Sequence, residues 1–421
     1  MRSRNALIAA LLPGAIVLGA LLLAACSSSS GKSASSSSTP TPSASECTGW
    51  SGPAPGAKPP AAAAAQALSD QCLRLNQVQV VGTHNSYHLE DPPKLLSTIK
   101  AFDKTLGESI EYTHPALPVQ FSREGVRQIE LDVFADPKGG RYAKRRLLSV
   151  INEPIDSGIP ALSKPGFKVL HAQDVDFNSN CLTFVDCLTA VRTWSHEHPK
   201  HLPIAILVEA KDDPTVDPLH MGFVVPPPLT TADFDALDAE IRSVFPAKEM
   251  ITPDDVRGTH ATLEEAVRTG TAWPTLADSR GKVLFLLDQS DQRKLYVDGH
   301  PSLKGRVIFT NSTPGEPDAA FVEMNDPTGK YQAQIQQLVR EGYIVRTRSD
   351  GDTVEARADN TKPRDAAIAS GAQYVSTDYP APDKAPFPGG FVVTLPDNRP
   401  WRCDPVNTGP ACASAQLDTP G

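Results

Sequence analysis

Two histidines in this sequence follow apolar runs. His84 lies in VQVVGTHNSYH (78–88) and His171 ends VLH in FKVLHA (167–172). An imidazole titrates near neutral pH, so a pair of them can take a proton from one oxygen and give a proton to another. Around a phosphate, the two would act as general base and general acid. Either histidine alone is more often structural, so this interpretation requires a fold that brings both to one place. His88, three residues beyond the first run, is the weaker candidate.

Carboxylates follow a second pattern. Glu130 and Asp132 are two residues apart in an apolar run, so their side chains share one face of a strand. Two adjacent carboxylates repel each other unless a cation lies between them. With Glu209 and the amide oxygen of Asn85 they form an all-oxygen set, which suits Ca²⁺ or Mg²⁺ and lacks the His or Cys that zinc prefers. The alternative is an ion-pair network with nearby basic residues, namely Lys211, Arg346 and Arg348.

Eight short apolar runs could position these groups. They are 78–85, 126–135, 167–172, 204–211, 282–288, 306–311, 343–349 and 372–378. Near-continuous apolar runs are typical of parallel strands covered on both faces, and six helix candidates lie between them. This alternation predicts an α/β fold, a (β/α)₈ TIM barrel, with a doubly wound open sheet as the alternative. No G-x-G-x-x-G follows the first run, which disfavours a dinucleotide-binding version.

The barrel prediction places catalytic groups at the carboxyl ends of strands. The runs do end in ionisable residues, which is hard to reconcile with a purely structural core. Asp288 ends the fifth run and Asp378 ends the eighth. Because the last strand of a closed barrel lies beside the first, we expect Asp378 to neighbour His84 and to orient its ring.

The chain begins with an export signal. Residues 1–25 combine a basic start with an apolar core, and LAAC places Cys26 where bacterial lipoproteins carry their lipid. An uncleaved membrane anchor is the alternative. Residues 26–70 are rich in Ser, Pro and Ala and predict a flexible tether. We therefore expect a monomeric protein outside the cytoplasm, lipid-anchored to a bacterial membrane or secreted, with a catalytic domain at 71–385.

Six further cysteines predict disulfides in an exported protein. Proximity in sequence favours Cys47–Cys72, Cys181–Cys187 and Cys403–Cys412, although fifteen connectivities are formally open. A cysteine metal site is disfavoured, since no C-x-x-C occurs. The last pair would pin a loop-rich C-terminal extension at 386–421. The net charge of −9 argues against nucleic acid as a partner.

Four motifs carry a family resemblance: GTHNSY, GVRQIELDVFAD, VLHAQDVDF and LVEAKDD, in this order. Together they resemble the Ca²⁺-dependent phosphatidylinositol-specific phospholipases C of the secreted bacterial type, over about residues 77–379. The resemblance implies a PLC-like phosphodiesterase TIM barrel that binds one Ca²⁺. It would cleave phosphatidylinositol to diacylglycerol and an inositol phosphate, usually through a cyclic intermediate.

The resemblance also assigns roles to individual residues. It implies that His84 and His171 are catalytic. The implied calcium ligands are Asn85, Glu130, Asp132 and Glu209. From their positions, Lys211, Arg346, Arg348 and Asp378 are candidates for contacts with phosphate, with inositol hydroxyls or with the catalytic histidine. Metal-independent relatives carry an arginine where calcium would lie, and the two acids of the second run favour the calcium form.

Two other functions remain open. A glycerophosphodiester phosphodiesterase shares a barrel, a histidine pair and metal-binding carboxylates, but its usual His-Arg-Gly after the first strand is absent. A surface lipoprotein that binds inositol or another polyol without catalysis is the second. The presence of both histidines disfavours it. No membrane-binding accessory domain is recognisable, so the lipid anchor would have to supply membrane residence.

Overall fold

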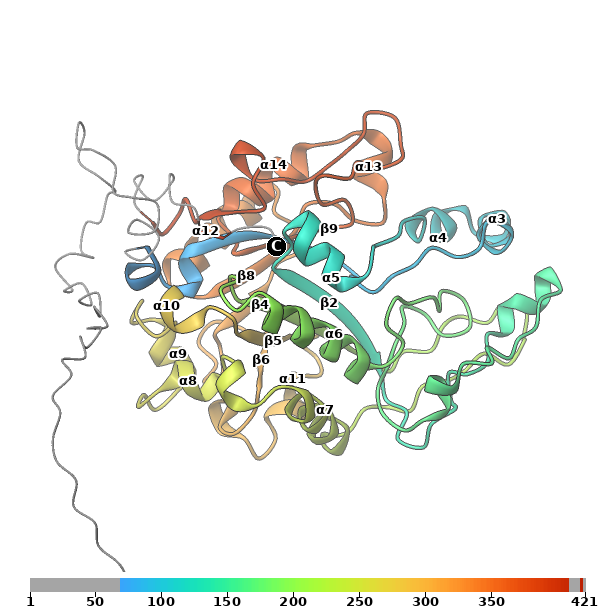
Figure 1. Cartoon of the computed structure of the whole chain (residues 1–421), viewed down its shortest axis with the longest axis horizontal. Helices are drawn as coiled ribbons and strands as arrows, with labels where there is room; N and C mark the ends of the chain where they lie inside the picture. The colour runs from blue at the N-terminus through green and yellow to red at the C-terminus, as the bar shows by residue number, and fades with distance from the viewer. Residues whose placement is uncertain (1–68, 409–416, 419–421) are drawn as a thin grey trace, which may run out of the picture. The chain divides into compact units, whose positions relative to one another are not determined.

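A parallel barrel forms the centre of the computed structural model, which describes residues 69–408 and 417–418. Its strands are β1 (Val78–Thr83), β2 (Gln128–Phe134), β4 (Ile204–Lys211), β5 (Val283–Leu287), β6 (Ile308–Thr310), β7 (Phe321–Glu323), β8 (Ile344–Arg348) and β9 (Tyr374–Thr377). They pair in the order β6-β5-β4-β2-β1-β9-β8-β7. A parallel bridge between Asn311 and Phe321 joins the two ends of this order. The predicted (β/α)₈ architecture is confirmed (Figure 1).

The prediction of a barrel strand at 167–172 is wrong. Within 167–172 only β3 (Lys168–Val169) is extended, and it pairs antiparallel with the end of β2, outside the barrel. The Lys168 ammonium is buried and donates to the carbonyls of Lys164 and Gly166, so this run includes a buried charge rather than a continuous apolar strand. The missing barrel strand is β7, whose three residues are too few for a detectable periodicity.

Helices cover the outside of the barrel. The longer ones are α6 (Phe184–Glu197), α7 (Thr231–Val244), α12 (Lys330–Arg340) and α14 (Lys362–Ser370). The shorter ones are α5 (Leu117–Val119), α8 (Pro253–Arg257), α9 (Leu263–Val267), α10 (Leu276–Ser279), α11 (Arg293–Val297) and α13 (Val354–Ala358). In α7, the spacing of Phe234, Leu237 and Ile241 puts three buried side chains on one face. Each such side chain contributes about 1.5–3 kcal/mol by leaving water.

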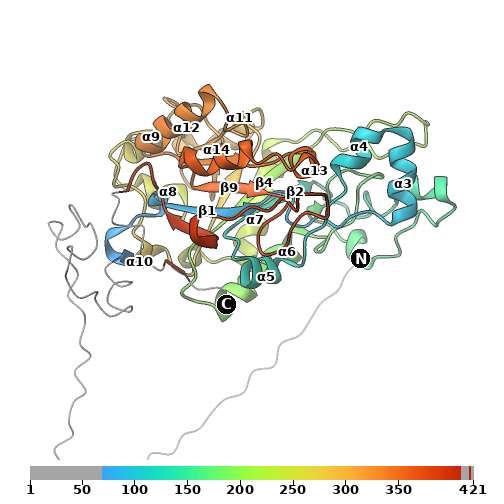
Figure 2. The same ribbon diagram turned by 90° about the horizontal axis from the view of Figure 1, so that it is seen from above.

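Four segments build a separate lobe, which we call the rim lobe; three of them follow barrel strands and the fourth follows β3. It consists of residues 89–112 with α3 (Pro93–Phe102) and α4 (Lys104–Ser109), and of residues 136–166, 170–178 and 212–229. Their apolar side chains form a cluster distinct from the barrel core: Leu95, Leu96, Ile99, Ile110, Leu147, Ile151, Val175, Phe177 and Phe223. Because three of these segments follow the barrel strands β1, β2 and β4, the lobe stands at the carboxyl ends of the barrel strands (Figures 1 and 2).

The C-terminal extension pairs with the first strand. In it, β10 (Trp401–Cys403) runs antiparallel to β1, with Cys403 opposite Val78. The predicted disulfide Cys181–Cys187 is present, with an S–S distance of 2.08 Å.

Cys72 and Cys403 are also disulfide-bonded. Their predicted partners, Cys47 and Cys412, lie outside the described residues. So do the export signal, Cys26 and most of the tether. No helix within the described part of the chain is long and apolar enough to cross a membrane.

Candidate active site

A polar cavity of about 270 Å³ opens at the carboxyl ends of the barrel strands. Its walls contain eight of the predicted site residues: His84, Asn85, Glu130, His171, Glu209, Lys211, Arg346 and Arg348. The other two lie directly behind the wall. Asp378 contacts His84, and Asp132 contacts Lys211. The structure therefore brings all ten predicted residues of the barrel together in one site.

His84 stands directly after β1 and is oriented by the neighbouring strand. Its Nδ1 lies 2.9 Å from Oδ1 of Asp378, which follows β9. Nη2 of Arg348 lies 3.3 Å from the same nitrogen. In the tautomer that donates Nδ1–H to Asp378, the shorter of the two contacts, Nε2 is the proton acceptor. Burial, and then the charges of Arg348 and Arg346, hold the pKa of His84 well below its ordinary value. The ring is therefore neutral at pH 7 and able to accept a proton.

His171 reaches the same cavity by a different route. It follows β3 in a loop of the rim lobe rather than a barrel strand, and its Nδ1 lies 2.8 Å from Oδ2 of Asp176. Burial raises the pKa of Asp176, but His88 and His171 outweigh it and bring that pKa below its ordinary value. A charged carboxylate thus orients His171. Sequence reasoning missed Asp176, although its place five residues after a candidate histidine, in HAQDVD, was a signal.

The three acidic side chains lie close to one another, as the sequence predicts. Carboxylate oxygens of Glu130, Asp132 and Glu209 all lie within 4.8 Å of one another. Asp132 and Glu209 are register partners on adjacent strands, β2 and β4. Burial and then the charge of Glu209 raise the pKa of Asp132 well above its ordinary value. Lys211 offsets part of this repulsion, with its Nζ 2.9 Å from Asp132 Oδ2 and 3.5 Å from Glu209 Oε2.

Two unpartnered oxygens indicate that the cluster fits a cation. Oδ1 of Asn85 and Oδ1 of Asp132 are buried without a hydrogen-bond partner. Orphaned buried oxygens are costly, and they require an explanation in a native site. A hard divalent ion with oxygen ligands supplies one, since it would satisfy both atoms and relieve the repulsion among the carboxylates.

The ion-pair network considered from the sequence is also present. Arg346, on β8, is buried and pairs with two carboxylates. One is Glu130 of β2, and the other is Glu323 of β7, whose Oε1 lies 3.0 Å from Nη1 of Arg346. The sequence pattern did not indicate Glu323, because this residue lies on the short strand β7. Burial and then the charges of Glu323 and Glu130 raise the pKa of Asp288 to about 10. Asp288 is therefore protonated at neutral pH.

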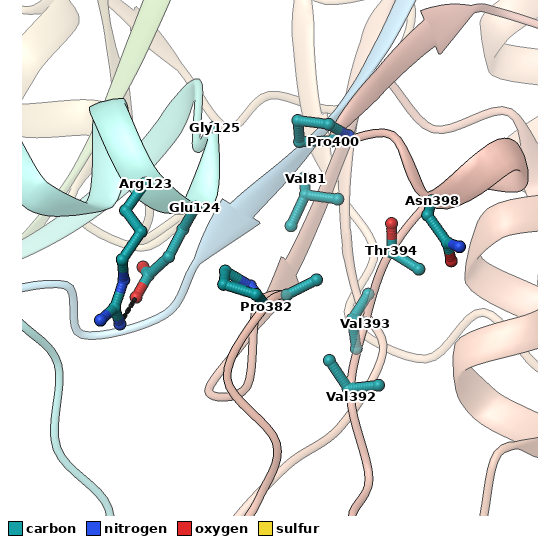
Figure 3. Close-up of a pocket in the computed structure, with 11 residues that line it drawn as sticks. Val81, Arg123, Glu124, Gly125, Pro382, Val392, Val393, Thr394, Asn398 and Pro400 are labelled. Carbon is teal, nitrogen blue, oxygen red and sulfur yellow. Dashed lines mark hydrogen bonds and ion pairs between the residues drawn. The ribbon is translucent and has the colours of Figure 1, made fainter. Parts of the chain in front are cut away.

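A second cavity, of about 380 Å³, lies beside β1 between residues 123–125 and residues 381–400. Figure 3 shows Arg123 and Glu124 on one wall, with Val393 on the opposite wall and Val81 and Pro382 between them. Burial raises the pKa of Glu124 to about 7. None of the predicted site residues lines this cavity. The residues that the sequence predicts for the site therefore gather at the mouth of the barrel and not in this second cavity.

Comparisons with known proteins agree with the motifs. The family model for phosphoinositide phospholipase C, Ca²⁺-dependent, matches residues 73–405. No curated protein matches the chain significantly.

Similar solved structures include a calcium-dependent phosphoinositol-specific phospholipase C from a Gram-negative Pseudomonas species. It has 20% identity and a TM-score of 0.46, over 80% of this chain and 96% of that one. A Ca²⁺-dependent phosphatidylinositol-specific phospholipase C from Streptomyces antibioticus has 20% identity and a TM-score of 0.43, over 73% and 95%. Since the family model spans most of the sequence, the chain belongs to the Ca²⁺-dependent phosphoinositide phospholipase C family.

Proposed function

We propose that this protein cleaves phosphatidylinositol into diacylglycerol and an inositol phosphate, which forms first as the cyclic phosphodiester. One observation carries the proposal. Two imidazoles, each oriented through Nδ1 by a buried carboxylate, line the same cavity as Glu130 and Glu209, two of the three clustered acids. This arrangement supplies an acid, a base and a cation site around one small polar volume, as transfer of a phosphoryl group requires.

His84 acts as the base in this proposal. The inositol 2-hydroxyl lies beside the phosphodiester of the same molecule, so its attack is intramolecular and gains from proximity. Its proton passes to the free Nε2 of neutral His84 as the bond between the 2-oxygen and phosphorus forms. Asp378 stabilises the imidazolium that results.

His171 acts as the acid. Its Nε2–H gives a proton to the glycerol oxygen as the bond from phosphorus to that oxygen breaks, and diacylglycerol leaves. Asp176 holds the ring through Nδ1 during this transfer. Arg348 and Lys211, on the cavity wall, contribute positive charge for the phosphate and hydrogen bonds for the inositol hydroxyls.

Asn85, Glu130, Asp132 and Glu209 would hold the calcium ion of this family. Bound there, calcium lowers the pKa of a nearby hydroxyl and stabilises negative charge on phosphoryl oxygens. Removal of the ion should leave the fold intact and abolish turnover, since the histidines and their carboxylates do not depend on it for position.

The substrate lies in a bilayer, so the mouth of the barrel must face the lipid surface. Nine large apolar side chains are exposed in the described part of the chain, and five stand on the rim lobe: Phe102, Leu106, Val216, Leu219 and Val225. We propose that these side chains contact the lipid interface beside the cavity. A lipid on Cys26 would keep the enzyme at an extracytoplasmic membrane.

Phosphorus NMR of phosphatidylinositol hydrolysis, with calcium and with excess chelator, tests the proposal. We expect calcium-dependent release of an inositol phosphate, and a loss of about 10²–10⁴-fold in kcat when either His84 or His171 is replaced by Ala. Turnover of glycerophosphoinositol without cleavage of the lipid would instead identify a glycerophosphodiester phosphodiesterase. Undiminished lipid cleavage in excess chelator would refute the metal assignment.

A further inference from the structure

His88 is a buried titratable residue that the proposed chemistry does not use. Its side chain is fully buried, and its ring stacks on that of Tyr112 at a centroid distance of 4.3 Å. Nε2 lies 2.9 Å from Oδ2 and 3.0 Å from Oδ1 of Asp176, and Nδ1 lies 3.0 Å from the carbonyl oxygen of Tyr112. Both partners can only accept, so both ring nitrogens donate.

Asp176 is shared between two histidines. Its Oδ2 accepts from His88 Nε2 and from His171 Nδ1, at 2.9 and 2.8 Å. The His88 contact reaches both carboxylate oxygens, which restricts rotation of the carboxylate about its last bond. A carboxylate fixed in this way holds the ring of His171 with Nε2 toward the cavity.

We propose that His88 is a positioning residue, which orients His171 by fixing Asp176. The inference rests on the proposed function, in which His171 protonates the leaving oxygen. His88 joins the segment after β1 to the rim lobe, because its backbone N–H donates to the Asn85 carbonyl at 2.8 Å while its ring contacts Asp176 and Tyr112. It therefore sets the place of His171 relative to the barrel residues.

Packing alone does not account for this side chain. An apolar residue of similar volume could fill the space over Tyr112, and buried ion pairs are often no more stabilising than well-packed apolar groups. His88 instead directs each ring nitrogen to one acceptor. Nε2 contacts Asp176, which holds His171. Nδ1 contacts the backbone carbonyl of Tyr112, whose hydroxyl accepts a hydrogen bond from Asn85 and not from either catalytic histidine.

Two variants of the full-length protein separate these contacts. His88→Gln places an amide N–H near the position of Nε2 and can keep the bond to Asp176. His88→Asn places one near Nδ1 and can keep only the bond to Tyr112. We expect kcat on phosphatidylinositol to fall less than about fivefold in His88→Gln and at least about 30-fold in His88→Asn. KM and the calcium concentration for half-maximal activity should stay unchanged in both. Equal kcat values in the two folded variants would overturn the proposal.

Nitrogen-15 NMR of the imidazole rings gives a readout that does not depend on turnover. The hydrogen-bonded Nδ1–H of His171, assigned by its loss in His171→Ala, should persist in His88→Gln and be lost or averaged in His88→Asn. Persistence in both variants would show that Asp176 holds His171 without His88. A wild type that keeps this signal but fails to cleave the lipid would refute the proposed function and leave the positioning role supported. His201→Asn is the control, since His201 is buried away from the cavity against Ser195 and Leu202.

Discussion

Calcium should stabilise the folded protein through the cluster of Glu130, Asp132 and Glu209. Carboxylate oxygens that lie within 4.8 Å of one another repel, when both groups are ionised, by at least about 3.5 kcal/mol at an effective dielectric of about 20, and this repulsion contributes to the raised pKa of Asp132. A bound cation removes that repulsion, and Asp132→Asn removes one of its sources. At a calcium concentration of about 100 times Kd, binding adds about 2.7 kcal/mol to the free energy of unfolding. For a domain of this size that raises Tm by about 4 °C.

Asp132→Asn should gain less stability from calcium than the wild type does. If the loss of one charged ligand weakens calcium binding about 30-fold, the ion adds only about 0.9 kcal/mol to the free energy of unfolding at the same calcium concentration. The Tm shift is then below about 2 °C. In chelator, the Tm of Asp132→Asn should equal or exceed that of the wild type, because the repulsion with Glu209 is gone. Scanning calorimetry with calcium and with chelator measures all four values. Asp298→Asn, which alters an exposed carboxylate, is the matched control. An undiminished calcium shift in Asp132→Asn would show that the ion binds elsewhere.

Three further predictions concern the histidines and the rim lobe. Asp378→Asn should lower kcat by about 10²-fold or more with little change in KM, since the hydrogen bond that orients His84 is altered; steady-state kinetics on phosphatidylinositol would contradict this if KM alone changed. Burial lowers the pKa of His201 to about 4. Between about pH 6.5 and pH 4 the imidazole of His201 is therefore protonated in the unfolded protein but not in the folded one. The free energy of unfolding thus falls as the pH falls, by up to about 1.4 kcal/mol per pH unit. Urea unfolding should give a shallower pH slope for His201→Gln than for the wild type, and equal slopes would refute the assignment. Finally, the double variant Val216→Asp, Val225→Asp should lower kcat/KM on phosphatidylinositol vesicles about tenfold and leave kcat/KM on a monomeric short-chain substrate unchanged. An equal loss on both substrates would exclude a membrane role for these side chains.

Much of the site could be predicted because strand geometry is simple. Alternate residues of a strand share a face, which placed Glu130 beside Asp132, and parallel strands end at the same rim, which placed both near Glu209 and His84. His171 does line the same cavity as His84, but it does not lie on the barrel strand that the sequence predicted. It belongs to a loop that follows a two-residue antiparallel strand, and no local pattern distinguishes such a run from a short barrel strand.

Other residues depend on tertiary contacts that no spacing reveals. Glu323 lies on a three-residue strand, below the length at which periodicity can be read. Asp176 and His88 are 88 positions apart and meet only because the rim lobe packs against the turn after β1. The boundaries of the tether and of the C-terminal extension stay predictions, as does the lipidation of Cys26.

The rim lobe has its own apolar cluster, so the two proposed catalytic histidines are held by two different apolar clusters. His84 extends from a barrel strand, whereas His171 and Asp176 belong to a lobe whose core is distinct from that of the barrel. Units of this kind can open at a lower free energy than the whole protein. Mild heat or denaturant should therefore inactivate the enzyme reversibly while the barrel remains folded. Amide hydrogen exchange in residues 136–166 and 212–229, rather than in β4 and β5, should follow the loss of activity.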